Sequence, residues 1–330
     1  MRPSRPKELL EAARVPALLI TDRTNVRYVT GYDCSFGVVF VAERSLTLFT
    51  DERYREAALR AVHEGIAVRP FDQLGAALRK VRLCGFESNV VTIAERAKWK
   101  RKYPNIKFIQ TEGVVASFRR EKGADELRAF RRAQGITREL LQRIPAALRR
   151  RPTEKELALL LLVQAHALGS DGLAFEPIVA FGTHTSEPHH RPTDRRLCVG
   201  QIVQIDVGAR VRGYCADQSR VFFTGAPTLR QRAVYDAVLA SKEAATAAVR
   251  PGVSVRELDR IARAVLRRRG FDRSFTHALG HGVGLDIHEE PSLSRRSDAV
   301  LRAGEIITIE PGVYLPGRFG IRLEDEVIVR

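Results

Sequence analysis

The chain has 330 residues, of which 44% are hydrophobic and 28% are charged. These fractions are typical of soluble globular proteins, and the length is enough for two domains of ordinary size. The formal net charge is +16 at pH 7. The basic residues are spread along the chain without interleaved aromatic residues, so we expect a solvated basic surface and no nucleic-acid partner.

The apolar runs exclude a membrane-spanning protein. None reaches the roughly 18–20 residues that a membrane span requires, and the longest candidate, residues 157–168, contains Gln164 and His166. Residues 1–20 lack an apolar core followed by a cleavage site, so we expect no signal peptide. The 4 cysteines show no CxxC spacing, which is typical of free thiols in a reducing compartment. We therefore expect a cytoplasmic protein without a membrane partner.

The first part of the chain alternates short apolar runs with helical patterns, which indicates an α/β domain. The predicted strands are 17–21, 37–41, 46–50 and 106–110, and the predicted helices are 52–65 and 72–81. Near Glu121-Lys122-Gly123 the pattern changes to a long helix, 124–144. We therefore place an N-terminal α/β domain at 1–122 and a second domain at 123–330.

The second domain mixes helices with strands. Thr153 with Glu156, and Ser254 with Glu257, have the spacing of capping boxes that begin helices, and Gly270 can end the second of these helices. The strand-rich stretches are 173–182, 201–224 and 305–329. We predict an α+β domain in which helices cover a mostly antiparallel sheet.

One predicted hairpin opposes two aspartates. In "VQIDVGARVRGYCADQ", residues 203–218, two apolar strands flank a turn at 211–213. If Val211 and Arg212 form the loop, Asp206 lies directly opposite Asp217. Opposed side chains have Cβ atoms only about 4.5–5.5 Å apart, and like charges at that distance destabilise a sheet.

A second predicted hairpin opposes two glutamates. In "GEIITIEPGVYLPGRFGIRLEDEVIV" the Pro316-Gly317 turn separates two strands, and pairing centred on Gly317 places Glu310 opposite Glu324. Alternate residues of a strand share a face, so Arg322 and Glu324 point to the same side. Four buried carboxylates cannot all stay ionised unless shared protons, arginine partners or metal cations compensate them.

The histidines favour metal cations. Five of the 8 histidines fall in two short segments, "EPHH" and "THALGHGVGLDIHEEP". Glycines at 280, 282 and 284 leave room around His281 for close approach by a ligand or by backbone. One imidazole with four carboxylates suits Mn²⁺ and tolerates Co²⁺ or Zn²⁺. Because four carboxylates exceed the need of one such ion, we expect two divalent ions that share bridging carboxylates.

These motifs resemble the pita-bread metallopeptidases, in particular the proline-specific branch with Xaa-Pro aminopeptidase and Xaa-Pro dipeptidase (prolidase). The segments "IVQIDVGARVRGYCADQSRVFFTG", "GHGVGLDIHEEP", "TIEPGVY" and "GIRLEDEVIV" are similar to that family's metal-binding segments. The family's ligand order is met by Asp206, Asp217, His281, Glu310 and Glu324. In the first domain, "TNVRYVTGY" and "LFTDERYREAA" resemble the creatinase-type N-terminal domain, which is common to peptidases and creatinase.

The resemblance implies a distribution of the ligands. It implies Asp206 on one ion, His281 and Glu310 on the other, and Asp217 and Glu324 bridging the two. It also implies that Glu310 carries a proton to the leaving proline nitrogen, and that the protein forms a homodimer.

The resemblance and the sequence positions also imply roles around the ligands. His189, in "FEPIVAFGTHTSEPHHRPTD", and His288 would donate hydrogen bonds to the substrate. Arg322, two residues before Glu324 on the same face, is expected to orient that carboxylate. His277, four residues before His281, is expected to support the ligands, with a packing role as the alternative.

We expect a dinuclear metallo-exopeptidase that hydrolyses the Xaa-Pro bond at the N-terminus of proline-containing peptides. The alternative is an Xaa-Pro dipeptidase, which must bind the carboxylate of proline, and for which Arg295, Arg296 and Arg318 are candidates. A non-catalytic pita-bread protein and creatinase are disfavoured because all five ligands are present. Methionine aminopeptidase is disfavoured because it lacks a creatinase-type first domain.

Overall fold

The computed structural model of the chain describes residues 6–43 and 45–330. It divides into two compact units, Met1–Arg119 and Arg120–Arg330. The expectation of no signal peptide concerns residues 1–20, of which the first five lie outside the described residues. Across the described ranges, no helix has both the length and the apolar character needed to cross a membrane.

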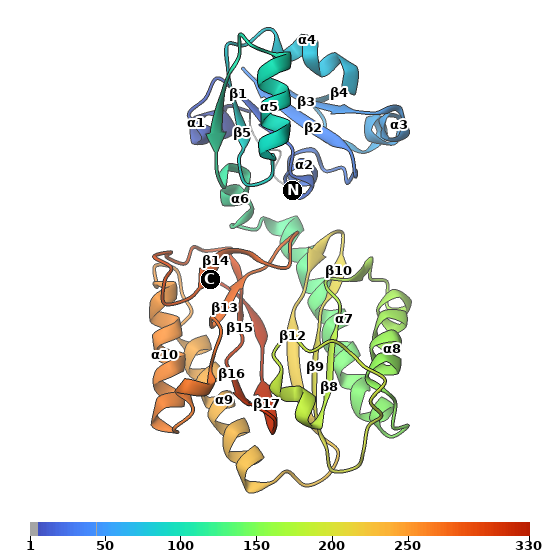
Figure 1. The fold of residues 1–330 in the computed structure, drawn as a ribbon, viewed down its shortest axis with the longest axis vertical. Coiled ribbons are helices and arrows are strands. Elements are labelled where there is room, and N and C mark those ends of the chain that lie inside the picture. The colour runs from blue at the N-terminus through green and yellow to red at the C-terminus, as the bar shows by residue number, and fades with distance from the viewer. Residues whose placement is uncertain (1–5, 44) are drawn as a thin grey trace. The chain divides into compact units, whose positions relative to one another are not determined.

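The first unit is built around a mixed sheet, which within residues 6–43 and 45–119 has six strands in the order β4-β3-β2-β1-β5-β6 (Figure 1). Strands β1, β2 and β3 pair antiparallel, whereas β4, β5 and β6 join in parallel. The elements are α1 (Pro6–Ala13), β1 (Ala17–Ile20), α2 (Arg23–Thr30), β2 (Gly37–Ala42), β3 (Ser45–Thr50), α3 (Glu52–Ala61), β4 (Ile66–Pro70), α4 (Leu74–Leu78), β5 (Leu83–Glu87), α5 (Ile93–Lys102), β6 (Lys107–Thr111) and α6 (Val114–Arg119). The predicted α/β class is confirmed.

The predicted helix 52–65 ends early, at Ala61, because the backbone of Val62 is extended. The predicted helix 72–81 is also shorter: a 3-10 turn at Phe71–Gln73 precedes α4.

The second unit combines four long helices with short antiparallel strands, as counted over residues 120–330. The elements are α7 (Ala124–Leu148), α8 (Glu154–Ala167), β7 (Gly172–Leu173), β8 (Ile178–Phe181), β9 (Ile202–Val207), β10 (Ala209–Val211), β11 (Tyr214–Cys215), β12 (Gln218–Phe223), α9 (Leu229–Ala247), α10 (Val255–Arg268), β13 (Gly280–Gly282), β14 (Glu289–Leu293), β15 (Ile306–Ile309), β16 (Gly312–Leu315), β17 (Phe319–Arg322) and β18 (Asp325–Ile328). The predicted α+β class with antiparallel pairing is confirmed.

Two apolar clusters fix the direction of the strand side chains in this unit. Helices α7 and α8 pack on β8 and β9 through a cluster that includes Val203, Ile205 and Val207. Helices α9 and α10 pack on β15 and β17 through a cluster that includes Ile321 and Leu323. Figure 1 shows the strands between these two helix pairs. Because side chains alternate along a strand, the residues between these apolar positions point away from the helices.

The first hairpin has a different register from the predicted one. Arg212 and Gly213 form its two-residue turn with φ of 50° and 83°, and Asp206 pairs with Ser219. The prediction that Asp206 lies directly opposite Asp217 is therefore wrong. Such a turn needs positive φ at both central residues, which glycine accepts readily and a β-branched residue such as Val211 does not. The two aspartates are diagonal neighbours on one face, still within reach of each other.

The second hairpin has the predicted register. Gly312 pairs with Arg322 in β16 and β17, and Ile309 pairs with Asp325 in β15 and β18. Both ladders are centred on Gly317, so Glu310 lies opposite Glu324 between them. The alternation along the return strand also agrees with the prediction.

One of the two predicted capping boxes forms. Thr153 accepts a hydrogen bond from the Glu156 N–H and the Glu156 carboxylate accepts one from the Thr153 N–H. The Ser254 side chain makes no capping bond: the Glu257 N–H donates to the Ser254 carbonyl oxygen at 3.0 Å, and the Glu257 carboxylate pairs with Arg260. The second capping-box prediction is therefore wrong. The predicted end of α10 is confirmed, since Gly270 follows it with φ of 76°.

Replacing Gly208 should destabilise the second unit. Gly208 lies between β9 and β10, where an added Cβ would lie 1.7 Å from the Ala216 carbonyl oxygen. The backbone must move, so we expect Gly208→Ala to lower the free energy of unfolding in urea by about 1–3 kcal/mol. Gly135→Ala is the matched control, because nothing lies within 4 Å of a Cβ at that helical position. Equal stability of the two variants would contradict the prediction.

Candidate active site

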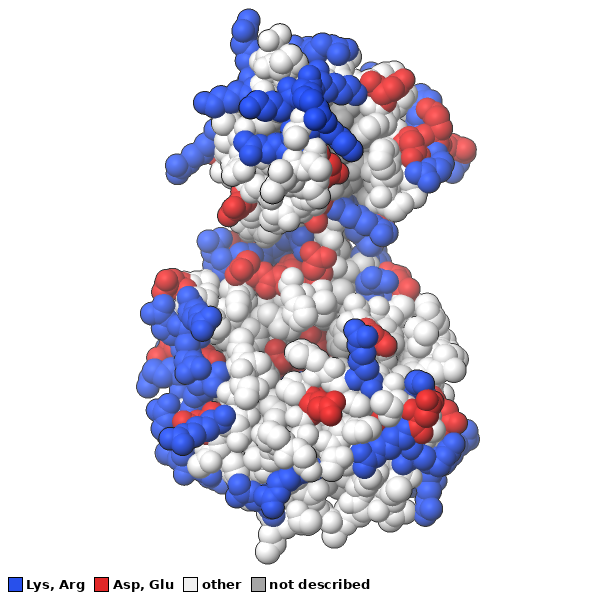
Figure 2. Space-filling model, viewed as in Figure 1, with Lys and Arg blue, Asp and Glu red and all other residues white. Residues whose placement is uncertain are grey.

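A pocket of about 450 Å³ lies in the second unit, and its lining includes the nine residues predicted to bind metal or to surround the metal ligands. Those residues are His189, Asp206, Asp217, His277, His281, His288, Glu310, Arg322 and Glu324. This volume is in the range of small-molecule and peptide pockets. In Figure 2, acidic atoms are visible in the hollow of this unit, while lysine and arginine side chains gather along its flanks.

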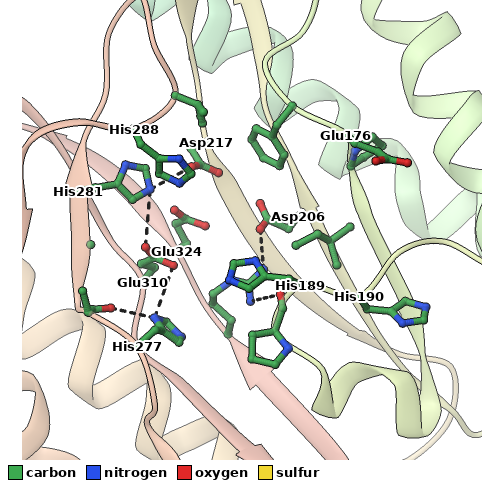
Figure 3. A pocket seen from close by; sticks show the side chains of 18 of the residues that line it. Glu176, His189, His190, Asp206, Asp217, His277, His281, His288, Glu310 and Glu324 are labelled. Carbon is green, nitrogen blue, oxygen red and sulfur yellow. Dashed lines mark hydrogen bonds and ion pairs between the residues drawn. The ribbon is translucent and has the colours of Figure 1, made fainter. Parts of the chain in front are cut away.

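The predicted ligands converge from separate segments of the chain. Asp206 is on β9 and Asp217 immediately precedes β12, His281 is on β13, and Glu310 and Glu324 follow β15 and β17. Figure 3 shows the carboxylates and the His281 ring facing one another across the pocket. The fold thus brings together acidic groups that are up to 118 residues apart, counted from Asp206 to Glu324 (324 − 206 = 118).

The ring of His281 is oriented as a ligand. Its Nδ1 lies 3.0 Å from the Gly282 carbonyl oxygen, so Nδ1 carries the proton and Nε2 presents its lone pair. Nε2 lies 3.5 Å from Asp217 Oδ2 and 3.7 Å from Glu310 Oε1. Burial lowers the pKa of His281 to about 4, which keeps the imidazole neutral. Potential ligand atoms of Asp217, His281 and Glu324 all lie within 4.8 Å of one another.

The carboxylates are poorly compensated by the protein itself. Burial, and then the charge of neighbouring carboxylates, raises the pKa of Asp217 and of Glu324 well above the ordinary value. Burial also raises the pKa of Glu310 to about 8. Asp206 Oδ1 and Glu324 Oε1 are buried and have no hydrogen-bond partner among the described residues. Divalent cations would neutralise the carboxylates and coordinate these two oxygens, so the residues present fit a metal centre.

Arg322 places a positive charge beside one of the buried carboxylates, Asp206, whereas we expected it to orient Glu324. Its Nη2 donates to Asp206 Oδ2 at 2.5 Å, and not to Glu324 as predicted. Its Nε donates to Ser219 Oγ at 2.9 Å, and its Nη1 donates to Tyr314 Oη at 2.9 Å. Because Ser219 pairs directly with Asp206 in the observed register, the guanidinium reaches both residues together.

The other predicted histidines surround the ligands. His277 Nε2 lies 3.0 Å from Tyr314 Oη, and its Nδ1 lies 4.0 Å from Glu310 Oε2. The ring centroid of His288 lies 4.4 Å from that of His281. His189 is exposed and lines the pocket. Within the part of the chain that the structure describes, the ring nitrogens of His189 and His288 make no hydrogen bond, so both can reach a substrate.

Glu326 supports the site and was not predicted to do so. It accepts hydrogen bonds from the Asp217 N–H at 2.6 Å, from Gln218 Nε2 at 2.8 Å and from Gln134 Nε2 at 3.2 Å. Its position two residues after Glu324 was a signal of a shared face, but its hydrogen-bond partners could not be read from the sequence.

Glu154 is a second residue that sequence reasoning missed. Its buried carboxylate accepts hydrogen bonds from the Phe181 N–H, from the rings of His184 and His190, and from the N–H and hydroxyl of Thr193. Glu154, His184 and His190 are close enough together to hold an ion. We assign them an anchoring role, because each Glu154 oxygen already accepts at least two hydrogen bonds. No role was predicted for Glu154 from the sequence, in which it lies between the two capping-box residues Thr153 and Glu156.

A divalent cation should stabilise the protein more at high pH than at low pH. Because the folded state raises the pKa of Asp217, Glu310 and Glu324, it binds more protons than the unfolded chain. The stability contributed by this cluster is therefore present below about pH 4.5 and is lost as the pH rises towards about 8. We expect the difference in Tm with and without Mn²⁺ to be larger at about pH 8 than at about pH 5.5. An equal difference at both pH values would contradict the expectation, and Glu324→Gln should reduce the difference.

Comparisons with known proteins agree with this site. Residues 128–330 match the model of metallopeptidase family M24, and residues 2–120 match the creatinase/prolidase N-terminal domain. The chain is 32% identical over 328 residues to an Xaa-Pro dipeptidase of Pyrococcus horikoshii, covering 98% of this chain and 92% of that protein. It is 30% identical over 322 residues to the uncharacterized peptidase YqhT of Bacillus subtilis, covering 96% of this chain and 91% of that protein.

Solved structures of similar proteins have the same fold. An X-Pro aminopeptidase from Thermotoga maritima is 31% identical with a TM-score of 0.90, covering 97% of this chain and 94% of that chain. An Xaa-Pro dipeptidase from Bacillus anthracis is 30% identical with a TM-score of 0.94, covering 98% of this chain and 94% of that chain. The fold, the converging acidic residues and these whole-length matches show that the chain belongs to metallopeptidase family M24.

Proposed function

We propose that the protein is a dinuclear metal-dependent exopeptidase that hydrolyses the Xaa-Pro bond at the N-terminus of peptides. The observation that carries this proposal is the pocket in which Asp206, Asp217, His281, Glu310 and Glu324 face one another. Relatives that match along the whole chain are named X-Pro aminopeptidase and Xaa-Pro dipeptidase, and both names support a proline-specific activity.

The five ligands would hold two divalent ions. Asp206 would bind one ion, His281 and Glu310 the other, and Asp217 and Glu324 would be shared. The oxygen-rich donor set favours Mn²⁺, with Co²⁺ or Zn²⁺ as alternatives. When bound, the ions would polarise the scissile carbonyl group and lower the pKa of a water molecule.

The protein's own residues would position the peptide and move protons. Glu310 would carry a proton to the leaving proline nitrogen. His189 and His288 would donate hydrogen bonds to the substrate carbonyl oxygen as negative charge develops there. The acidic lining of the pocket would attract the positively charged α-amino group. These roles fit cleavage one residue from the N-terminus.

We also infer a cytoplasmic homodimer. The 4 cysteines support a reducing compartment, because all are free thiols in the structure. The homodimer rests on the family resemblance.

Loss of a shared ligand should abolish activity. Glu324→Ala removes a carboxylate that both ions would use, so we expect no measurable peptidase activity and a lower metal content by mass spectrometry. Glu257→Ala, which removes a glutamate on the solvent side of α10, is the control and should retain both. Full turnover by Glu324→Ala with unchanged metal content would refute the ligand assignment.

The form of exopeptidase can be decided with two substrates. An Xaa-Pro dipeptide and an Xaa-Pro-Xaa tripeptide are each incubated with the Mn²⁺-loaded protein, and then with chelator. We expect hydrolysis of both substrates, and its loss when the metal is removed. Hydrolysis of the dipeptide alone would identify a prolidase, and hydrolysis of neither would favour a binding role.

A further inference from the structure

The segment Pro188–Thr193 presents two basic side chains to the pocket. His190 is buried, and its Nε2 lies 2.9 Å from Glu154 Oε2. Its neighbours His189 and Arg191 are exposed, and both line the pocket. Figure 3 shows the ring of His190 turned away from Asp206, on the far side of His189. His190 is thus held by Glu154 in the interior, and its neighbours His189 and Arg191 face the pocket, where they can contact a substrate.

The backbone of this segment is held on both sides of Arg191. On one side, the Pro188 carbonyl oxygen accepts a hydrogen bond from Arg322 Nη1 at 3.1 Å. On the other side, the N–H and hydroxyl of Thr193 donate to Glu154 Oε2 at 2.9 and 2.6 Å. Because the backbone is already fixed, only the side chain of Arg191 has to be ordered when it binds a ligand.

Arg191 is also the arginine of the pocket that remains available. Two arginines line the pocket within the described residues, Arg191 and Arg322. Arg322 is occupied by Asp206, Ser219 and Tyr314. Arg191 has no hydrogen bond or ion pair to any residue that the structure describes.

The three arginines that the sequence suggested for binding a substrate carboxylate lie elsewhere. Arg295, Arg296 and Arg318 are exposed, and none of them belongs to the pocket lining.

The pocket thus has an acidic end, formed by the metal ligands, and one uncommitted guanidinium beside His189. An Xaa-Pro dipeptide is a zwitterion whose two charges match these two features. A longer peptide has an amide in place of the carboxylate that follows proline.

We propose that Arg191 determines specificity by binding the carboxylate of a C-terminal proline, which makes Xaa-Pro dipeptides the preferred substrates. This inference rests on the proposed Xaa-Pro exopeptidase function. The planar guanidinium can donate two parallel hydrogen bonds to a carboxylate, whereas a proline carboxamide would leave a cation facing an N–H donor.

The test compares one Xaa-Pro dipeptide with its C-terminal amide in the Mn²⁺-loaded protein. We expect Arg191→Ala to lower kcat/KM for the dipeptide by roughly 10- to 100-fold, the loss typical of a hydrogen bond to a charged group. The loss should fall mainly on KM, and kcat/KM for the amide should change by less than about twofold. Arg191→Lys should recover part of the loss, because it keeps the charge without the planar fork. Arg318→Ala is the matched control and should behave like the wild type.

A binding measurement separates this inference from the proposed function. Metal-free wild type and Arg191→Ala are titrated with L-proline and with L-prolinamide and followed by NMR. If the variant binds L-proline more weakly than the wild type does but binds L-prolinamide equally well, the role of Arg191 is supported. This holds even if the wild type hydrolyses no peptide, because that result would contradict only the proposed function. Suppose that the wild type cleaves the dipeptide, and that Arg191→Ala lowers kcat/KM equally for the dipeptide and its amide or lowers it for neither. Either result would refute the role of Arg191 and leave the proposed function standing.

Discussion

The structure depends on the burial of several carboxylates around one pocket. Asp206, Asp217 and Glu324 are each less than one-tenth exposed, and Glu310 faces them. Burial raises the pKa of such groups because it removes the water that stabilises their charge. The protein offsets part of this cost with Arg322 on Asp206, but Asp206 Oδ1 and Glu324 Oε1 stay without partners among the described residues. The geometry favours divalent cations because they would neutralise the negative charge that the protein itself leaves uncompensated.

The backbone can hold these groups together because the strands that contain or adjoin them also have an apolar face. Val203, Ile205 and Val207 on β9 pack against α7 and α8, which leaves Asp206 on the opposite face. Leu323 packs against α9 and α10 in the same way and leaves Glu324 facing the pocket. Hydrophobic burial on the outer faces therefore supplies the free energy that holds the acidic side chains in place.

A second set of buried polar residues gives the pocket its shape. Glu326 accepts a hydrogen bond from the N–H of Asp217, which fixes the backbone at this proposed metal ligand. Glu154 fixes His190 and Thr193, so the pocket wall that carries His189 and Arg191 is rigid although both side chains are exposed. The site therefore combines an electrostatically strained acidic end with a substrate-facing segment held by satisfied hydrogen bonds.

The fold class, the register of the second hairpin and nine of the residues that line the pocket could be predicted from the sequence alone. These features depend on local patterns: alternation along strands, the Pro316-Gly317 turn and the spacing of acidic residues and histidines. The first hairpin was predicted two residues out of register, because its turn depends on which residues adopt positive φ, and Arg212 does so here.

The hydrogen-bond partners of the buried polar groups became known only from the folded structure. It joined Arg322 to Asp206 and Glu154 to His190, and it left Arg191 facing the pocket while Arg295, Arg296 and Arg318 stay outside it. Hydrogen bonds between segments more than 30 residues apart depend on how helices and strands pack, and no local pattern encodes that packing. For the same physical reason, the sequence could name the charged residues of the site but could not say which of them were already paired.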